Sequence, residues 1–387
     1  MTRWASHLYI YHGKERGIEA AVVNESLRQA HLLQDNGLPP VLTLGHLSFH
    51  TDIPYWKLRT YVARRLVIID EKSEPKVFCA YNSYRSFQIR KQLGGYRRIC
   101  VPEPDLMKVQ KWIDHYILSQ VKASPYSYAF EKGQSIFDCA RQHLGCRWLV
   151  KLDLRNFFES LSEIQVYRVF RDIGYERLIS FEFSRICTKV RETSREIMKR
   201  WSNTYNRSIE AYHRPVMGHL PQGAPTSPKL ANLIVSPLDK AIATLADSYG
   251  LVYTRYADDM TFSTCSMSFN RDVAKKVIHD VSQTLPKYGL RPHTQKIYVV
   301  PPGARKVVLG LLVDGDKVRL SKDFRSALEC HWYHCAKDPV EHAKQREFSS
   351  VLGLKNYLHG LIAYAKQVDS NYVDKLTRKY GEIPWPI

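Results

Sequence analysis

The chain lacks any apolar run long enough to cross a bilayer, and its first residues lack the long hydrophobic segment of a secretory signal. Internal repeats and low-complexity tracts are also missing. Hydrophobic residues make up 44% of the chain, which is enough to build packed cores. The sequence therefore predicts a soluble, cytoplasmic protein without a membrane partner, and its 387 residues suggest about two or three domains or subdomains.

Acidic residues are scarce. The chain has 38 of them against 57 lysines and arginines, which gives a formal charge of +19. Such an excess favours a polyanionic partner, because bound phosphates are neutralised and counterions are released. The 24 tyrosines and 7 tryptophans can also stack on unpaired bases. Composition thus favours a nucleic-acid partner, but it does not separate an enzyme from a passive binder.

Paired cysteine motifs for a structural metal are missing as well. The eight cysteines are scattered, and in a cytoplasmic chain we expect them to be reduced. The only suggestive cluster is Cys330–Cys335, which also contains His331 and His334. Zinc could use such ligands, but a second ligand pair is absent and the spacing is helical. An ordinary packed helix is the favoured interpretation.

The pattern of apolar residues outlines the organisation of the chain. An alternating, β-rich segment occurs at 81–102, around a Gly94-Gly95 turn, and an apolar run typical of a buried strand occurs at 148–154. Helical spacing is expected over 2–36, 41–65, 106–121, 228–246, 272–285 and most of 322–387. The polar, basic stretch 191–215 breaks the pattern and is interpreted as an insertion or a long loop.

The most informative segment is Tyr256–Asp259, which ends in two adjacent carboxylates. Its flanks are rich in β-branched and aromatic residues, so the segment is expected to be the turn of a hairpin. Neighbouring carboxylates repel each other, and hard oxygen ligands of this kind suit Mg²⁺. On these four residues alone, an Asp-Asp turn without a metal is equally open.

A third carboxylate, Asp153, ends the apolar run 148–154, as expected of a buried strand that delivers an acid. Together, Asp153, Asp258 and Asp259 could hold two Mg²⁺ ions, which can activate a hydroxyl and stabilise a leaving pyrophosphate. Between them, the Gly- and Pro-containing stretch 220–228 predicts a tight loop before a helix, where backbone can lie close to a nucleotide. The pattern is that of nucleotidyl transfer.

Seven blocks follow one another in the order found in reverse transcriptases, and most closely those of the bacterial retron type. They are 81–102, 129–136, 151–158, 220–232, Tyr256–Asp259, Gly289-Leu290 with Lys296, and 309–311. The chain resembles this family from about residue 37 to its end. The resemblance implies an α+β right-hand polymerase fold with fingers, a palm of antiparallel sheet and helices, and a helical thumb. The implied domains are an N-terminal helical extension (1–36), fingers with N-terminal helices (37–145), a palm (146–318) with a basic insertion (189–215), and the thumb (319–387).

The resemblance also implies roles for individual residues. The metal ligands would be Asp153, Leu154, Asp258 and Asp259, and Lys296 would join the aspartates as a catalytic general acid. The nucleotide-binding residues would be Lys91, Arg97, Phe158, Gln222 and Gly223, and the primer grip Leu309 and Gly310. Simpler explanations remain open, with Phe158 as a core residue, Gln222 as a solvated loop residue and Lys296 as a surface lysine.

Candidate RNA-binding residues come from two places. One is the stretch 139–143, where the family carries Asn-Ala-x-x-His and this chain has Cys139 in place of the asparagine. The other is the basic insertion, which, like residues 1–36, could dock RNA or a protein or serve only as packing or loop. The candidates are His143, Arg195, Lys199, Arg200, Trp201 and Arg207.

The implied function is that of an RNA-directed DNA polymerase. It would copy a cognate structured non-coding RNA into single-stranded DNA from dNTPs, with two Mg²⁺ ions, in defence against phage and with an effector protein encoded nearby. Cys139 and Leu309, which depart from the retron motifs, keep open a non-retron defence enzyme that makes long, repetitive or untemplated DNA. An RNA-binding scaffold with dispensable catalysis is less favoured, because every expected catalytic side chain is present. The oligomeric state is left open.

Overall fold

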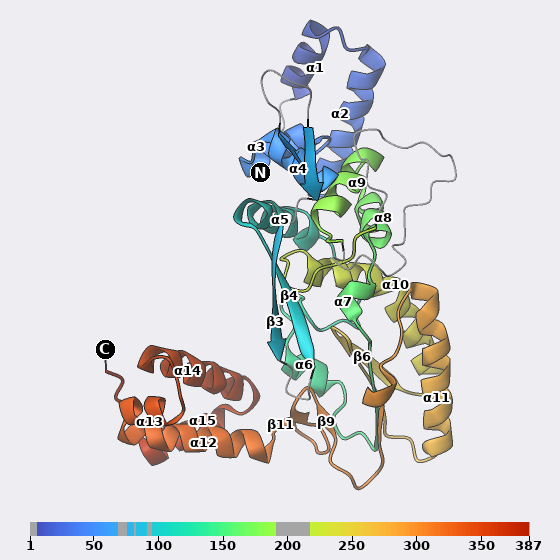
Figure 1. Ribbon diagram of the computed structural model, residues 1–387. Helices are drawn as coiled ribbons and strands as arrows, with labels where there is room; N and C mark the ends of the chain where they lie inside the picture. Colours follow the sequence, from blue (N-terminus) through green and yellow to red (C-terminus); the bar gives the residue numbers. More distant parts are fainter. Residues whose placement is uncertain (1–5, 69–75, 81–82, 91–94, 191–216, 387) are drawn as a thin grey trace. The chain divides into compact units, whose positions relative to one another are not determined.

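The computed structural model describes residues 6–68, 76–80, 83–90, 95–190 and 217–386 (Figure 1). The chain divides into two compact units that alternate along the sequence. Unit 1 comprises Met1–Pro125, Leu154–Lys240 and Leu285–Arg291, and unit 2 comprises Tyr126–Asp153, Ala241–Thr284 and Pro292–Ile387. The predicted boundaries at 36, 145 and 318 separate fingers, palm and thumb, which these two units do not distinguish, so they stay predictions. The basic stretch 191–215 lies outside the described residues.

Unit 1 is built mostly of helices. They are α1 (Ser6–Glu15), α2 (Ala20–Asp35), α3 (Leu44–Thr51), α4 (Tyr55–Ala63), α5 (Pro104–Tyr116), η1 (Leu118–Gln120), α7 (Phe157–Ser160), α8 (Glu163–Ile173), α9 (Arg177–Ile186), most of α10 (Ser227–Ser248) and η2 (Leu285–Tyr288). Helix α8 shows why these segments are helical. The side chain of Ser162 accepts from the amide of Gln165 in a capping box, and Gly174 ends the helix in a left-handed conformation. Val166 and Phe170 form its buried side.

Two hairpins belong to unit 1. The predicted hairpin is confirmed as β3 (Tyr84–Arg90) paired with β4 (Tyr96–Pro102) in antiparallel register. A second hairpin pairs β1 (Arg65–Ile68) with β2 (Lys76–Ala80). The sequence did not predict it, because the residues between its strands are charged and lack the glycine or asparagine of a tight turn.

The main sheet lies in unit 2. Its four antiparallel strands follow the order β6 (Val252–Tyr256), β7 (Asp259–Thr264), β5 (Trp148–Asp153), β8 (Tyr298–Val300). Strand β5 has neighbours on both sides and is almost wholly buried, which explains its continuous apolar sequence. The helices α6 (Ile136–Arg141) and α11 (Arg271–Thr284) and the short helix η3 (Thr294–Lys296) belong to the same unit.

The C-terminal part of unit 2 is helical, as predicted. Its helices are α12 (Lys322–Lys337), α13 (Pro339–Gln345), α14 (Val351–Val368) and α15 (Ser370–Tyr380) (Figure 1). They share a core with a small sheet of β9 (Val307–Val308), β10 (Leu311–Leu312) and β11 (Arg319–Leu320). In this core Leu311 and Leu320 lie with Leu328, Trp332 and Leu358. The mixture of helices with antiparallel sheets confirms the α+β prediction.

The stretch Cys330–Cys335 falls within α12, where Trp332 and Cys335 are buried in this core. Across the described residues, no three histidine, cysteine or acidic side chains form a group that could hold a metal ion. The stretch forms part of a packed helix, which was the favoured interpretation. The described residues also contain no helix that could span a membrane.

Candidate active site

The predicted turn Tyr256–Asp259 is the tip of the β6–β7 hairpin. Tyr256, the last residue of β6, pairs with Asp259, the first residue of β7, and Ala257 and Asp258 form a two-residue turn between them. Ala257 has a φ of 55°, a left-handed conformation that is costly for a residue other than glycine. The buried guanidinium of Arg255 donates a hydrogen bond of 3.0 Å to the carbonyl oxygen of Ala257. This hydrogen bond, from a side chain two residues before Ala257, stabilises the strained turn.

The register of the sheet brings the predicted carboxylates together. Asp153 at the end of β5 and Asp259 at the start of β7 are paired across the ladder. Directly opposed residues in an antiparallel pair project from the same face, with Cβ atoms about 5 Å apart. Asp258 precedes Asp259 in the turn, so all three acids lie at one end of the main sheet. None of this depends on unit 1, because the three residues belong to unit 2.

Burial and neighbouring negative charge raise the pKa of Asp258 and of Asp259. Burial, together with the charges of Asp153 and Asp259, raises the pKa of Asp258 to about 6. Burial and Asp153 also raise the pKa of Asp259, while Lys151 and Lys296 oppose this. In the part of the chain that the structure describes, the three carboxylates are not close enough together to form a metal-holding group. Their oxygen donors and their shared, unfavourable negative charge fit a hard divalent cation.

Lys296 contacts one of these carboxylates. Its Nζ lies 2.7 Å from Oδ2 of Asp153, and this hydrogen bond raises the pKa of the lysine. Helix η3, which carries Lys296, is fixed to the end of β5 because the amide of His293 donates to the carbonyl oxygen of Asp153 at 2.7 Å. Lys296 is therefore not an isolated surface lysine.

Lys151 is a member of this site that the sequence analysis did not single out. It lies two residues before Asp153 on β5, pairs with Thr261 of β7, and so projects from the same face as Asp153 and Asp259. Its charge acts on Asp259, whose pKa it lowers. The alternation along β5, with a lysine two residues before the acid in an otherwise apolar run, was the signal that could have identified it.

The predicted nucleotide-contacting loop is fixed to β4 within unit 1. The carbonyl oxygen of Gln222 accepts a 2.7 Å hydrogen bond from the amide of Cys100. Gly223 has a φ of 111°, and a Cβ on it would lie 2.9 Å from Cγ2 of Ile99 and 3.1 Å from the carbonyl oxygen of Cys100. Only glycine allows the loop to approach the strand this closely.

Two other predicted nucleotide-binding residues lie in unit 1. Arg97 pairs with Ile89 in the β3–β4 hairpin and is exposed. Phe158 is half-buried in α7 and packs edge-on against the buried ring of Phe157, with ring centroids 5.4 Å apart. Phe157 thus takes the core position, and Phe158 keeps part of its ring accessible. Lys91 lies outside the described residues.

A buried ion cluster lies beneath the start of the Gln222 loop. Glu163 is fully buried and accepts from Gly218 N at 2.7 Å, with Nη1 of Arg64 and Nη1 of Arg185 at 2.9 and 3.4 Å. Burial by itself would raise the pKa of Glu163, but the two guanidinium groups lower it on balance. A Cβ on Gly218 would approach this cluster to within 2.7 Å. Glu163 therefore fixes the backbone four residues before Gln222.

The predicted primer grip is the turn between β9 and β10. Leu309 and Gly310 are its two central residues, with φ values of 50° and 86°. Positive φ at both positions is the conformation that two-residue hairpins favour. A leucine in the first position is strained, as Ala257 is in the other hairpin.

His143, predicted to contact RNA, is buried instead. Only 1% of its surface is exposed, and both ring nitrogens are hydrogen-bonded, to Ser263 Oγ and to Thr254 Oγ1, each at 2.7 Å. No ring nitrogen remains to contact a base or a phosphate, so the prediction does not fit this structure. The other RNA-binding candidates, Arg195, Lys199, Arg200, Trp201 and Arg207, lie outside the described residues.

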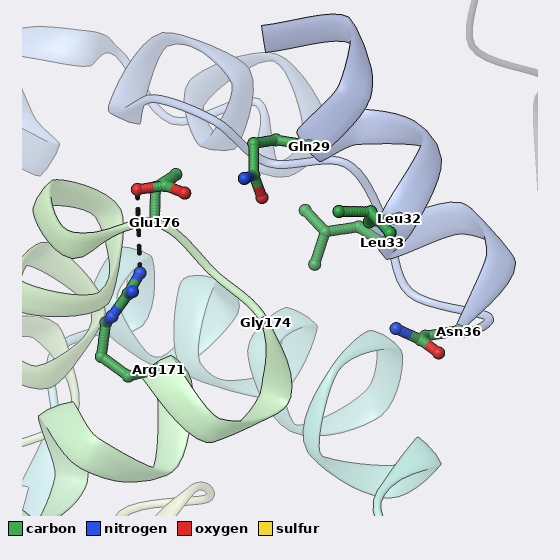
Figure 2. Close-up of a pocket in the computed structure, with 7 residues that line it drawn as sticks. All are labelled: Gln29, Leu32, Leu33, Asn36, Arg171, Gly174 and Glu176. Carbon is green, nitrogen blue, oxygen red and sulfur yellow. Dashed lines mark ion pairs between the residues drawn. The ribbon is translucent and has the colours of Figure 1, made fainter. Parts of the chain in front are cut away.

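A cavity of about 260 Å³ lies between α2 and the end of α8 in unit 1 (Figure 2). Arg171 and Glu176, which form an ion pair of 3.7 Å, face the side chains of Gln29, Leu33 and Asn36 across it. None of the predicted site residues lines this cavity.

Comparison with known proteins identifies the family of this chain. Residues 89–319 match the family model described as "Reverse transcriptase (RNA-dependent DNA polymerase)". The chain belongs to this family, and it is an RNA-directed DNA polymerase. The retron Ec86 reverse transcriptase of Escherichia coli is 31% identical over 91% of this chain and 95% of its own length. The retron Mx65 reverse transcriptase of Myxococcus xanthus is 28% identical over 95% of this chain and 81% of its own. The chain is thus a reverse transcriptase of the retron type.

A solved structure of apo telomerase from Candida tropicalis matches 71% of this chain and 60% of its own, with 12% identity and a TM-score of 0.39.

Proposed function

We propose that this reverse transcriptase copies a cognate structured non-coding RNA into single-stranded DNA by two-metal nucleotidyl transfer. One observation carries the proposal: the sheet register places Asp153 opposite Asp259, with Asp258 beside them at a strained turn. Bound Mg²⁺ ions would activate the attacking hydroxyl and stabilise the leaving pyrophosphate. The three carboxylates would hold the ions, with Leu154 contributing its backbone carbonyl oxygen.

The remaining residues of the proposal bind and position the substrates. Arg97 would engage the triphosphate, Gln222 and Gly223 would border the incoming dNTP, and Phe158 would exclude a ribose 2′-hydroxyl. Lys296 would give a proton to the leaving pyrophosphate. Leu309 and Gly310 would hold the primer end.

The setting of this activity is also part of the proposal. The relatives are retron enzymes by name. We infer by analogy a cytoplasmic complex of the protein with its RNA and DNA product, acting in antiphage defence with an effector encoded nearby. The formal charge of +19 supports RNA binding through phosphate neutralisation.

Sequencing of the nucleic acids that co-purify with the protein tests the proposal. We expect one discrete, short DNA species joined to RNA through a 2′-5′ linkage. This species should disappear when the Asp258→Asn variant is purified in the same way. Long, repetitive or untemplated DNA in the wild-type preparation would contradict the proposal while leaving polymerase activity intact.

A further inference from the structure

The imidazole of His143 connects the two strands of the hairpin that carries Asp258 and Asp259. Its Nδ1 contacts Ser263 on β7, and its Nε2 contacts Thr254 on β6, both at 2.7 Å. The thiol of Cys139, from α6, donates to the same Thr254 hydroxyl at 3.4 Å. One side chain from outside the sheet therefore holds both strands at once.

His143 lies on the face of the sheet that bears the acids. Thr254 pairs with Thr261 of β7, so the two side chains project from the same face of the sheet. Asp259 lies two residues before Thr261 on β7, so its side chain also projects from this face. Ser263 is four residues after Asp259 on the same strand. At about 3.4 Å per residue, the two hydroxyls lie roughly 7 to 14 Å behind the carboxylates. His143 is thus too far back to contact reacting atoms, but it is on the correct face to set the position of the strands.

The ring is held in a neutral, fully bonded state. Burial, together with the charge of Lys151 on β5, lowers the pKa of His143 to about 4. A neutral imidazole has one donor and one acceptor, so one hydroxyl must accept from the ring while the other donates to it. The segment that carries His143 is also fixed, because Gly145 N donates to Val313 O at 2.8 Å and Arg147 N donates to Thr264 O at 2.9 Å. Because its own segment is fixed and its ring is neutral, His143 can hold β6 and β7 in fixed positions relative to each other.

The β6–β7 hairpin has two features that make such an additional contact useful. Strand β6 is the outer strand of the four-stranded sheet, and on its other side the described residues form an isolated parallel bridge from Ser127 to Arg255 in place of a further strand. The turn beyond it is strained at Ala257. Displacing a reacting group by about 1 Å can cost about 10²-fold in rate.

We propose that His143 is a positioning residue of the polymerase site: by bonding Thr254 and Ser263, it fixes β6 against β7 and so holds Asp258 and Asp259 in place relative to Asp153. The proposal rests on the proposed function of these aspartates. It replaces the predicted RNA contact, and it concerns the chemical step and not RNA recognition.

Amide replacements of His143 give a specific test. A glutamine amide reaches the position of Nε2 and can keep the bond to Thr254, whereas an asparagine amide reaches the position of Nδ1 and can keep the bond to Ser263. We expect His143→Leu to lower kcat for RNA-templated primer extension by about 10²-fold, with the KM for dNTP and the Kd for RNA unchanged. His143→Gln should recover part of the rate, and adding Thr254→Val should remove that recovery. His143→Asn should also recover part of the rate, and adding Ser263→Ala should remove that recovery.

Coupling and folding are measured on the same variants. The His143→Leu/Thr254→Val double variant should be no slower than His143→Leu, because both changes remove one interaction. Binding of Mn²⁺ measured by electron paramagnetic resonance should weaken in His143→Leu, and this readout does not need turnover. Circular dichroism shows whether His143→Leu folds. If it does not, kcat is compared among the two amide variants and the Thr254→Val and Ser263→Ala single variants, and each is expected to be slower than the wild type.

Two results would overturn the proposal. One is an unchanged kcat in every His143 variant. The other is a loss of RNA affinity with normal kcat at saturating RNA, which would restore a role in RNA recognition. Either result differs from a failure of the proposed function itself, in which replacement of Asp258 and Asp259 would leave DNA synthesis intact.

Discussion

Asp153 and Asp259 are paired across the β5–β7 ladder, and the ammonium group of Lys296 lies 2.7 Å from the Asp153 carboxylate. The negative charge that a metal ion would neutralise is therefore partly balanced by a lysine. Asp258, which lacks such a bond, has a pKa raised to about 6 by burial and by the other two acids. Protons, Lys296 and divalent cations are expected to compete for these three carboxylates.

Metal affinity should depend on pH in a defined direction. Below pH 6 Asp258 takes up a proton and loses a ligand charge, so we expect Mn²⁺ affinity to fall as the pH decreases through about 6. Titrations by electron paramagnetic resonance at pH 5, 6 and 7 measure this effect. Equal affinity at all three values would show that Asp258 is not a ligand or that its pKa is not raised.

The stability of the metal-free protein should change in the opposite sense. The pKa of folded Asp258 lies above its ordinary value of 3.8, so protonation favours the folded state. Stability in EDTA should therefore decrease as the pH rises from about 4 to about 6. Melting temperatures of the wild type and of Asp258→Asn, compared over this interval, measure the effect. The variant should show a smaller decrease, and identical curves would contradict the assignment.

Replacing Lys296 should separate metal binding from chemistry. Lys296→Met removes the cation that competes at Asp153, so we expect metal affinity to rise while kcat falls by about 10²-fold, the usual contribution of a general acid. Calorimetric titration with Mg²⁺ and single-turnover primer extension measure the two effects. Weaker metal binding in this variant would mean that Lys296 orders the ligands and does not compete with the metal. Lys287→Met, at a lysine of unit 1 that is not part of the acidic site, serves as the control for loss of a lysine.

The close approach of Gly223 to β4 can be tested with one methyl group. Gly223→Ala places a Cβ 2.9 Å from Ile99 and should displace the Gln222 loop, which raises the KM for dNTP. Gly303→Ala is the matched control, because Gly303 also has a positive φ, of 83°, but no atom lies within 4 Å of its added Cβ. If both variants raise the KM equally, the effect is not a steric displacement of this loop.

Much of this arrangement was predictable from the sequence. The Tyr256–Asp259 turn, the strand that ends at Asp153 and the long helix α10 follow from local pattern, because each depends on residues close to one another in the chain. The sequence also predicted that Asp153 and Asp259 act together. The residues alone suggested that these acids could share metal ions, and the resemblance to a family assigned them that role. Their position as neighbours could not be predicted locally, because it depends on the strand order and register.

The residues that were missed or misassigned depend on tertiary packing. His143 looked like an RNA contact because its motif could be read without knowing that two strands cover the ring. Lys151 was read as part of an apolar strand, and its effect on Asp259 depends on the pairing of β5 with β7. Glu163 resembled any acid at the start of a helix, and its two arginine partners are 99 and 22 residues away along the chain (163 − 64 and 185 − 163).

The Glu163 cluster gives a prediction about stability. Glu163→Gln keeps the shape of the side chain but leaves the guanidinium groups of Arg64 and Arg185 facing a neutral amide in a buried site. We expect a loss of about 3–5 kcal/mol in the free energy of unfolding, measured by urea denaturation. Glu176→Gln, which removes the partly exposed ion pair with Arg171, is the control and should cost less than about 1 kcal/mol. Similar losses in the two variants would contradict the importance of burial here.

The central claim is that the carboxylates at the tip of the β6–β7 hairpin carry out RNA-templated DNA synthesis. The most direct test is primer extension on an RNA template with dNTPs and Mg²⁺, comparing the wild type with the Asp258→Ala/Asp259→Ala variant. Binding of the template to both proteins should be verified in the same experiment. We predict extension by the wild type and none by the variant, with RNA still bound. Unchanged DNA synthesis by the variant would contradict the claim.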